Sequence, residues 1–421
     1  MSDHGTLSPE IEVGPSARAT APVPLSILMV APQPFFRPRG TPFSVLHRIR
    51  ALLLLGHRVD LVTYPFGEDV VYPGLEIFRS ARPAGVFDVR IGPSLAKILL
   101  DALLFAKVRE LLHEKPYDLI HTHEEAGVLG AWISSRYRIP HVYDMHSSLP
   151  QQFENFGRYN WRPVVGVFQQ LERYTLAGSQ AVITICPALY EHVAATGYRG
   201  QLALIENSLD FQPPAITEEE DAVLRVRLGL GGEPVVVYTG TIELYQGLDL
   251  LVQSAQLVRQ RIPNIRFLIV GGEPQQSASL RRLARKLGVE AHFVLVPAVP
   301  ATEVFRYQRL ADVLVTCRAR GTNTPLKIYQ YLRAGKPIVA TRIRSHTQVL
   351  DPATAELVGL SAGEIAAGLI RVLEDPAYGR ELARASARLG AEDYSDAAYI
   401  GRLRELLARL PIHRPVADHG R

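Results

Sequence analysis

The 421-residue chain is 47% hydrophobic and 21% charged, with a mean hydropathy of +0.05, which is typical of a globular protein rather than a disordered one. Its length suits two domains of about 150–200 residues each. A net charge of +4 and a pI near 9.0 fit anionic small molecules or an anionic membrane face, but they are too weak a bias to indicate nucleic acid.

The N-terminal segment is polar and lacks the apolar core of a signal peptide, so we expect a disordered tail over residues 1–24. No stretch reaches the roughly 18 uninterrupted apolar residues of a membrane span. The nearest candidate, 95–108, is interrupted by Lys97, Asp101 and Lys107. We therefore expect no membrane-spanning helix.

The first half of the chain alternates buried strands with helices. Apolar runs of strand length lie at 25–32, 57–64, 117–123, 139–146 and 181–186. Between the first two, the segment 43–56 has apolar residues at helical spacing and ends at Gly56. Buried strands separated by helices predict a parallel sheet with βαβ crossovers.

The same alternation restarts in the second half. Strand-like runs lie at 234–240, 265–272, 292–296, 313–317 and 337–341, with a helix over 248–260 after the first. Between the halves, 206–222 is polar, acidic and contains two prolines, which indicates a linker. We therefore predict an α/β protein of two doubly wound domains that face a cleft. The predicted parts are a tail (1–24), a first domain (25–210), a linker with the start of the second domain (211–232), a second domain (233–395), a final helix (396–410) and a tail (411–421).

The two cysteines, Cys186 and Cys317, fall in different predicted domains, which argues against a disulfide framework and favours a reducing cytosol. We therefore expect a cytoplasmic protein. Basic residues among the leucines of 95–112 leave open a peripheral contact with the anionic inner face of a membrane. Apolar residues all round the axis favour the alternative, a core helix of the first domain.

Doubly wound sheets bind ligands beyond the carboxyl ends of their strands, so the loops after the strands are candidate sites. After the first strand, Gly40 lets the backbone turn closely around a ligand, although an ordinary turn explains it equally well. Neither G-x-G-x-x-G nor G-x-x-x-x-G-K-[ST] follows any strand. This absence counts against a Rossmann oxidoreductase and against a P-loop nucleotide site.

Histidines follow two strands of the first half. His123 and His146 each end a strand, where their side chains can enter the cleft, and this position favours a functional role over structural packing. A zinc site would need a closed set of ligands, and no H-x-x-x-H occurs near Glu124 and Glu125. We therefore expect no metal.

In the second half, turns rich in glycine or polar residues follow the strands at one sheet edge. They contain Gly240 and Gly272, and the positive ends of the helices that follow suit phosphate groups. Arg318, Arg320 and Lys327 add cations at this edge, although most arginines of the chain are explained by a solvated surface. For Lys327 a function is favoured, because the dipole at a helix start disfavours a cation unless an anion accompanies it.

The ordered segments over 25–410 resemble the GT-B glycosyltransferases of family 4, the retaining, sugar-nucleotide-dependent group 1 type. The resemblance implies two Rossmann-like domains, with the donor sugar nucleotide mainly on the second domain and the acceptor mainly on the first. It also implies that the final helix crosses back to the first domain. The segments that carry it include RGTPFSVLHRIRALLLLGHRVDLVT, HVYDMH, VVVYTGTIELYQGLDLLVQSA, RFLIVGGEP and TPLKIYQYLRAGKPIVAT.

The resemblance further implies roles for individual residues. We expect His146, which matches a strand-end histidine of the family, to act in catalysis together with Lys327 and Arg320. A loop near donor phosphate and acceptor would contain Gly40 and Thr41, with His123 beside it. The implied donor-binding residues are Gly240, Thr241, Gln246, Gly272, Arg318, Thr324, Pro325, Leu326 and Gln330.

Four positions depart from the family pattern. Thr241 and Gln246 stand where the family carries an Arg and a Lys that hold the donor diphosphate. Thr322 and Gln330 stand in place of the two glutamates of the E-x7-E motif, although a glutamine can still accept hydrogen bonds from ribose hydroxyls. The departures indicate either a subfamily solution or a non-catalytic relative that binds a nucleotide or a partner. A sugar-nucleotide 2-epimerase shares the fold, but the missing carboxylates count against it.

We therefore expect retaining transfer of a sugar from a nucleotide-diphosphate sugar to a hydroxyl of a glycan or lipid-linked acceptor, in polysaccharide or glycolipid biosynthesis. No cofactor, metal or nucleic acid is expected. The leaving diphosphate can take the acceptor proton, so no dedicated base is required. The sequence leaves open the sugar, the nucleotide base, the acceptor and the oligomeric state.

Overall fold

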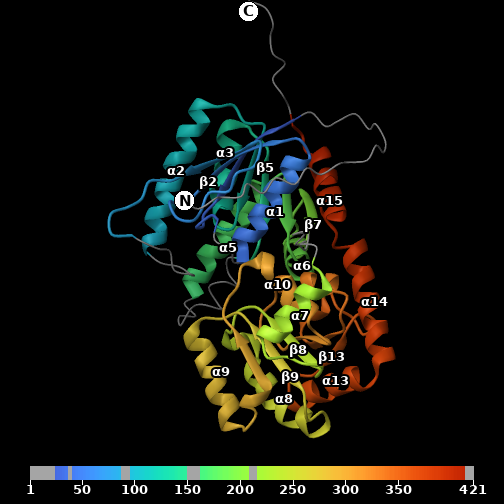
Figure 1. The fold of residues 1–421 in the computed structure, drawn as a ribbon. Coiled ribbons are helices and arrows are strands. Elements are labelled where there is room, and N and C mark those ends of the chain that lie inside the picture. The colour runs from blue at the N-terminus through green and yellow to red at the C-terminus, as the bar shows by residue number, and fades with distance from the viewer. Residues whose placement is uncertain (1–23, 37–39, 87–94, 149–161, 208–215, 413–421) are drawn as a thin grey trace, which may run out of the picture.

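The computed structural model describes residues 24–36, 40–86, 95–148, 162–207 and 216–412, which form two parallel sheets with helices packed on them (Figure 1). The first sheet has seven strands in the order β3-β2-β1-β4-β5-β6-β7, and the second has six in the order β10-β9-β8-β11-β12-β13. In each sheet the order reverses beside the first strand, as in doubly wound folds. The prediction of an α/β protein with two such sheets is confirmed. Both predicted tails lie almost wholly outside the described residues.

The first domain contains the seven-stranded sheet. Its strands are β1 (Ser26–Ala31), β2 (Arg58–Thr63), β3 (Leu75–Arg79), β4 (Leu119–His123), β5 (His141–Met145), β6 (Ala181–Thr184) and β7 (Gln201–Leu204). Its helices are α1 (Gly40–Leu54), α2 (Leu95–Glu114), α3 (Ala126–Tyr137), α5 (Arg162–Ala177) and α6 (Pro187–Ala195). Alternate residues of a strand face opposite sides of its sheet. Met29 of β1 accordingly joins the core beneath α1, and Leu28 and Val30 join the core beneath α2.

The second domain contains the six-stranded sheet. Its strands are β8 (Val235–Thr239), β9 (Arg266–Val270), β10 (Phe293–Val296), β11 (Val313–Thr316), β12 (Ile338–Thr341) and β13 (Glu356–Val358). Its helices are α7 (Glu218–Arg227), α8 (Leu248–Arg261), α9 (Pro274–Lys286), α10 (Ala301–Arg309), α11 (Leu326–Arg333), α12 (Arg344–Thr347), α13 (Ala362–Glu374) and α14 (Pro376–Glu392). Two short 3-10 helices, η1 (Leu244–Gln246) and η2 (Glu290–His292), complete it.

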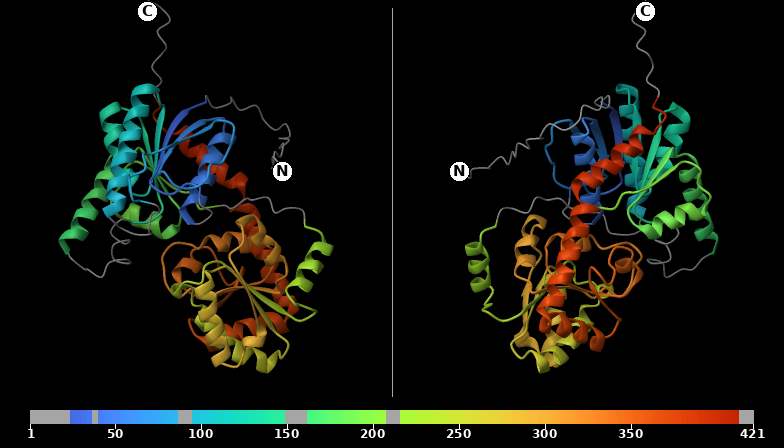
Figure 2. Two further views of the ribbon diagram at one scale, coloured as in Figure 1. Left: turned by 60° about the vertical axis from the view of Figure 1, so that its left-hand side comes forward. Right: turned by 90° about the vertical axis from the view of Figure 1, so that its right-hand side faces the viewer.

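The final helices run along one side of both domains (Figure 2). Helix α14 packs on α11 of the second domain, and α15 (Asp396–Ala408) packs on α1 and β7 of the first. Tyr399, Leu403 and Leu406 of α15 are buried in the core beneath α1. The predicted final helix that crosses back to the first domain is therefore confirmed.

The structure differs from the predicted elements at the sheet edges and in the linker. The strands β3, β7 and β13 were not predicted, because edge strands of three to five residues carry little hydrophobic pattern. Helix α7 begins at Glu218, inside the range 206–222 that was predicted to be a linker. Thr217 and Glu220 form a capping box, and the acidic residues that suggested a linker fill the first helical turn, where the helix dipole favours negative charge.

Candidate active site

Lys327 lies in the first turn of α11 and is only 8% exposed. Its Nζ donates to Oε1 of Gln246 over 3.3 Å and lies 3.7 Å from the centre of the Tyr238 ring. Burial lowers the pKa of this amine to about 7, and the nearby Arg318 lowers it as well. Among the described residues no carboxylate pairs with Lys327. A buried amine without a counter-charge is a position that an anionic ligand would complete.

The loop after β8 approaches this amine at Gly240. Gly240 has a φ of +130°, which favours glycine, and a Cβ built there would lie 2.9 Å from Nζ of Lys327. The Tyr238 hydroxyl donates to the main-chain oxygen of Thr241 over 2.7 Å and so fixes the loop. Gly272, two residues after β9, packs against the same loop, since a Cβ there would lie 2.5 Å from the side chain of Ile242. The structure thus brings these predicted donor residues together at one sheet edge.

Arg318 shapes the loop before α11. Its Nε donates to the main-chain oxygen of Arg320 over 2.7 Å, and one terminal nitrogen donates to that of Asn323 over 3.0 Å. Burial lowers the pKa of Arg318. The side chain of Arg320 is exposed. The two predicted arginines therefore differ, because Arg318 holds the loop and Arg320 extends from it.

The start of α11 is held by the segment that follows β12. Pro325 is the N-cap residue and Leu326 is the first residue of the helix. The hydroxyl of Thr324 accepts a hydrogen bond from Nε2 of Gln348 over 2.7 Å, and the same nitrogen lies 3.0 Å from the main-chain oxygen of Thr322. Gln348 therefore fixes the loop that leads into Lys327.

Gln330 lies one turn after Lys327 on α11 and is partly exposed. Its Oε1 lies 3.5 Å from Nε2 of Gln308, a buried residue that also donates to the hydroxyl of Thr239 over 3.2 Å. The protein thus supplies a donor to the oxygen of Gln330. An uncharged amide occupies the position at which the family pattern has a glutamate.

In the first domain, four side chains gather around the buried carboxylate of Asp144. Nε of Arg48 lies 2.8 Å from its Oδ2, and both side chains are 1% exposed. His121, His123 and His146 lie 3.4, 3.7 and 3.5 Å from the same carboxylate. Burial alone would raise the pKa of Asp144, but Arg48 and the histidines hold it well below the ordinary value. The carboxylate is therefore ionised, and its charge is balanced mainly by Arg48.

The two histidines predicted to act at the cleft are hydrogen-bonded to each other. Nδ1 of His123 lies 3.0 Å from Nε2 of His146. Burial lowers the pKa of His123 well below the ordinary value, so its ring is neutral and can either donate or accept this hydrogen bond. His146 is 4% exposed and His123 is fully buried, so the surrounding side chains fix the orientation of both rings.

Ligand atoms of His121, His123 and Asp144 lie within 4.8 Å of one another, close enough to hold a metal ion. The residues fit a metal poorly, because the guanidinium of Arg48 already bonds to the carboxylate oxygen nearest the histidines. A divalent cation would have to displace or repel that buried positive charge. The expectation of a site without metal stays a prediction.

The loops after β1, β4 and β5 meet beside these histidines. Gly40 opens α1 with a φ of +44°, and the hydroxyl of Thr41 donates to Oε1 of Glu124 over 3.5 Å. Ser147 donates to the other oxygen of Glu124 over 3.1 Å. Glu124 itself has a φ of +52°, which is uncommon for a residue with a side chain. The predicted loop of Gly40 and Thr41 is therefore joined to the residue that follows His123.

Each half of the chain also matches a family model. Residues 233–375 match the model "Glycosyl transferases group 1", and residues 39–208 match "Glycosyl transferase 4-like domain". The chain belongs to the group 1 glycosyltransferases of family 4, which have the GT-B fold. The resemblance inferred from the sequence is thereby confirmed. This glycosyltransferase contains, within the described residues, no helix long and apolar enough to cross a membrane.

Curated relatives of this glycosyltransferase carry glycosyltransferase names. A GDP-mannose-dependent alpha-(1-6)-phosphatidylinositol monomannoside mannosyltransferase of Mycolicibacterium smegmatis is 30% identical over 216 residues, which is 48% of this chain and 56% of the relative. A D-inositol 3-phosphate glycosyltransferase of Nocardiopsis dassonvillei is 26% identical over 375 residues, which is 82% of this chain and 84% of the relative.

Solved structures share the fold. Sucrose-phosphate synthase of Thermosynechococcus elongatus has a TM-score of 0.75 at 20% identity and covers 91% of this chain and 98% of its own. Alr3699/HepE of Anabaena in complex with UDP-glucose has a TM-score of 0.70 at 20% identity, covering 92% and 100%. At this identity the likeness shows the GT-B fold.

Several residues of the site were not predicted. Arg48 lies within an apolar helical pattern, and the one available signal was a charge on the otherwise buried face of α1. Asp144 precedes His146 by two residues, so the alternation of a strand could have placed both on one face of the sheet. Nothing in the sequence indicated that Asn323 would bond to the first domain.

Proposed function

We propose that this glycosyltransferase moves a sugar, with retention of configuration, from a nucleotide-diphosphate sugar on the second domain to a hydroxyl of a glycan or glycolipid on the first. The observation that carries the proposal is the buried amine of Lys327, which lies beside the Gly240 loop without a carboxylate partner among the described residues. A diphosphate in front of α11 would supply the missing charge and meet the positive end of that helix.

The difficult step is departure of the diphosphate. The glycosidic bond to the donor phosphate breaks, the sugar passes through an oxocarbenium-like state, and the acceptor oxygen bonds to the same face of the sugar. Charge accumulates on the leaving phosphate, so fixed cations and amides stabilise this state most. Lys327 and the main chain at Gly240 and Thr241 are the candidates for this role. The leaving phosphate oxygen takes the proton of the acceptor hydroxyl.

In this proposal the first domain orients the sugar. His146 would face the donor sugar, while its hydrogen bond to His123 and the charge of Asp144 fix the ring. The positive charge needed at the diphosphate comes from the chain, so the proposal needs no metal. Peripheral contact with an anionic membrane belongs to the same proposal, supported by the exposed Ile98 and Leu99 at the start of α2.

The relatives support a nucleotide donor, but their names differ in the nucleotide. One curated relative is named for GDP-mannose, and one structural neighbour was solved with UDP-glucose. The first experiment is therefore calorimetric titration of the full chain with UDP, GDP, ADP and their sugar conjugates. We expect one diphosphate to bind to the wild type and to lose at least about tenfold in affinity in Lys327→Ala. Gln275→Ala, which changes an exposed side chain of α9, is the matched control.

Binding of one diphosphate that Lys327→Ala removes would support the donor site and name the base for an acceptor screen. Failure of every diphosphate to bind would overturn the proposed donor site. That result would favour a non-catalytic role for the protein. The observation that supports this alternative is that Thr241 and Gln246 are uncharged.

A further inference from the structure

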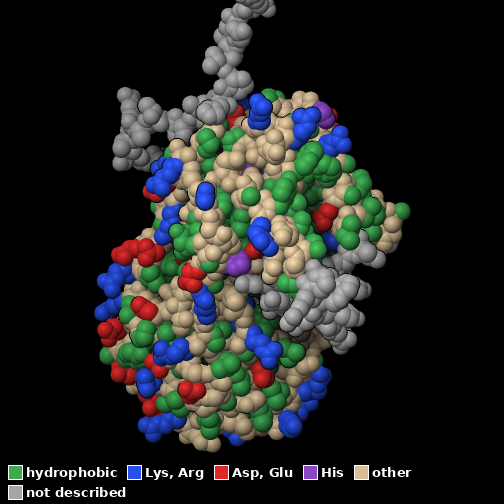
Figure 3. Space-filling model, turned by 180° about the vertical axis from the view of Figure 1, so that it is seen from behind, with side chains coloured by type: hydrophobic (Ala, Val, Ile, Leu, Met, Phe, Trp, Pro, Cys, Tyr) green, Lys and Arg blue, Asp and Glu red, His purple; other side chains and the backbone are tan. Residues whose placement is uncertain are grey.

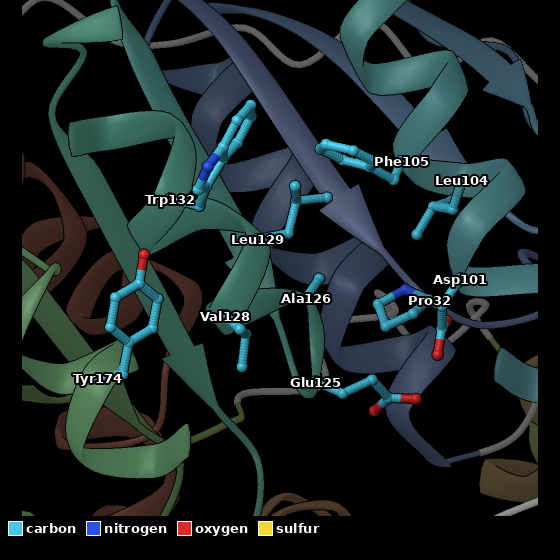
Figure 4. A pocket seen from close by; sticks show the side chains of 10 residues that line it. All are labelled: Pro32, Asp101, Leu104, Phe105, Glu125, Ala126, Val128, Leu129, Trp132 and Tyr174. Carbon is cyan, nitrogen blue, oxygen red and sulfur yellow. The ribbon is translucent and has the colours of Figure 1, made fainter. Parts of the chain in front are cut away.

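A groove of about 400 Å³ lies in the first domain between α2, α3 and α5 (Figure 4). This volume lies in the range of small-molecule sites. The ring of Phe105 on α2 packs edge-to-face on Trp132 of α3, with ring centres 5.3 Å apart. Leu104 and Leu129 complete this apolar part of the groove. None of these residues belongs to the proposed donor site.

The other end of the groove is acidic. The carboxylates of Asp101 and Glu125 lie there together, beside Pro32. Tyr64 donates its hydroxyl to Asp101, and Lys97 forms an ion pair with Glu125. Burial raises the pKa of Asp101 to about 6. Among the described residues the lining contains two carboxylates and no Lys, Arg or His. Carboxylates accept hydrogen bonds from hydroxyl groups and repel anions, so this end selects an uncharged polyol over a phosphate.

The apolar end continues across the surface. A second hollow of about 630 Å³ follows α5 and shares Tyr174 with the groove. Its lining includes Val167, which is 58% exposed, and Tyr174 is 46% exposed. In Figure 3, which shows the molecule from behind, hydrophobic side chains gather on the first domain in the upper right of the view. A ligand whose head lies at the carboxylates therefore has an apolar path for a tail of several methylene groups.

The acidic end adjoins the candidate reaction centre along the chain. Glu125 follows His123 by two residues, and Pro32 directly follows β1. Glu124, between His123 and Glu125, accepts the hydrogen bond from Thr41. A hydroxyl bound at the acidic end is thus held at the carboxyl edge of the first sheet, where ligands of doubly wound sheets react.

We propose that this groove is the acceptor site, and that the acceptor is an amphipathic glycoside with an uncharged, hydroxyl-bearing head at Asp101 and Glu125 and an apolar tail along Phe105, Trp132 and Tyr174. The proposal rests on the proposed glycosyl transfer and deepens it by naming the class of acceptor. The proposal is supported by the difference between the acidic end and the apolar end of the groove, because neither a free sugar phosphate nor a fully apolar molecule would fit both ends.

The test is calorimetric titration of the full chain, below micelle concentrations, with n-octyl β-D-glucoside, D-glucose and n-octyl β-D-glucuronide. We expect octyl glucoside to bind, and glucose to bind at least about tenfold more weakly because it lacks the tail. The glucuronide, with the same tail and an anionic head, should also bind about tenfold more weakly. Trp132→Ala should weaken octyl glucoside about tenfold. Val226→Ala, an exposed apolar residue of α7, is the control.

Two conservative variants test the head. Asp101→Asn and Glu125→Gln should each narrow the preference for glucoside over glucuronide, whereas Glu110→Gln, on α2 but outside the groove lining, should not. Thermal unfolding of each variant shows whether it is folded. Two variants are used because Asp101 also accepts a hydrogen bond from Tyr64, so Asp101→Asn changes more than the charge of the groove.

Equal binding of glucose and octyl glucoside, or tighter binding of the glucuronide, would overturn the proposal. A second outcome would also overturn it. If the protein binds vesicles of phosphatidylglycerol and phosphatidylcholine, if this binding depends on Trp132, and if octyl glucoside does not bind, the groove contacts a membrane instead of an acceptor. Diphosphate titrations on the same variants separate the two proposals. If a diphosphate binds and requires Lys327 but no alkyl glycoside binds, the acceptor site is wrong and the donor site stands.

Discussion

Nδ2 of Asn323 donates a hydrogen bond of 2.7 Å to the main-chain oxygen of His146, and this bond joins the two domains at the candidate active site. Oδ1 of Asn323 lies 3.7 Å from Sγ of Cys186, a second residue of the first domain. Asn323 belongs to the loop that Arg318 holds and that leads into Lys327. The residue proposed to meet the diphosphate is therefore connected through one loop to the residue proposed to face the sugar.

The first prediction concerns this connection. Asn323→Ala removes one of the side chains that link the domains, so we expect arrangements with the two domains further apart to gain population and kcat to fall about tenfold with a smaller change in KM. Small-angle scattering should show a larger radius of gyration. The same change at the exposed Gln275 should alter neither quantity. An unchanged radius and an unchanged kcat in Asn323→Ala would show that the bond does not hold the domains together.

The second prediction concerns proton uptake at Lys327. Burial lowers the pKa of its amine to about 7, and a bound diphosphate would raise it again. At pH 8 the free protein holds this amine mostly neutral, so binding should take up roughly one proton, and affinity should fall as pH rises above about 7. Calorimetry in buffers of different ionisation enthalpy measures the uptake. Lys327→Met should abolish it, and uptake that persists in this variant would assign the proton elsewhere.

The lowered pKa of Lys327 also makes the stability of the folded chain depend on pH. The unfolded chain has the ordinary lysine pKa of 10.5, so between about 7 and 10.5 it holds more protons than the folded chain. The contribution of Lys327 to the free energy of unfolding therefore rises with pH across that window. In Lys327→Met the free energy of unfolding should increase less between pH 7 and pH 9 than in the wild type. Denaturant unfolding at pH 7 and pH 9 tests this, and a curve as steep in the variant as in the wild type would exclude Lys327 as its source.

The third prediction concerns Gln330. Gln330→Glu restores the carboxylate of the family pattern and retains a partner in Nε2 of Gln308, 3.5 Å away. A carboxylate accepts hydrogen bonds from ribose hydroxyls about twice as strongly as an amide, so we expect the diphosphate to bind about tenfold more tightly. The gain should vanish with a 2′,3′-dideoxy analogue. An equal gain for both nucleotides would place Gln330 away from the ribose.

The fold could be predicted well from the sequence because both sheets are parallel and buried. Runs such as 25–32 and 234–240 are almost wholly apolar, and the helices between them show the helical period. The short edge strands β3, β7 and β13 lacked that signal. Helix α7 was missed because its first turn is acidic, which suits a helix start as well as a linker.

The candidate site was predictable only in part. Lys327, Gly240 and Gln246 follow strands in the sequence, and the structure brings them into contact. The ion pair of Arg48 and Asp144 joins residues 96 positions apart, and neither residue stands at a strand end with an obvious ligand motif. Such a pair depends on how α1 packs on the sheet, and tertiary packing of this kind leaves no local pattern.

The fourth prediction concerns that ion pair. Arg48→Met leaves the buried carboxylate of Asp144 without its main counter-charge, so we expect the free energy of unfolding to fall by about 3–5 kcal/mol. Asp144→Asn should cost a similar amount, and the double variant less than the sum, because it buries no unpaired charge. The exposed pair of Arg261 and Glu374 is the control, where Glu374→Gln should change stability by less than about 1 kcal/mol. Strict additivity of the two buried substitutions would contradict the pairing.

The last prediction concerns Glu206, which lies after β7 where the two domains join. Tyr329 of α11 donates to its Oε1 over 3.1 Å, and Tyr394, between α14 and α15, also bonds to it. Burial raises the pKa of Glu206 from 4.5 to about 7. The folded chain therefore holds more protons than the unfolded chain between those values, and stability falls as pH rises from about 4.5 to 7.

Glu206→Gln keeps an oxygen for both tyrosines and removes the buried charge. We expect it to stabilise the protein above pH 7 by up to about 3 kcal/mol, at 1.36 kcal/mol for each unit of pKa, and to leave stability near pH 4.5 almost unchanged. Thermal unfolding at pH 5 and pH 8 measures the difference, with the exposed Glu110→Gln as control. An equal gain in stability at both pH values would show that the substitution acts through packing, because Glu206 destabilises the folded chain only when it is ionised, at the higher pH.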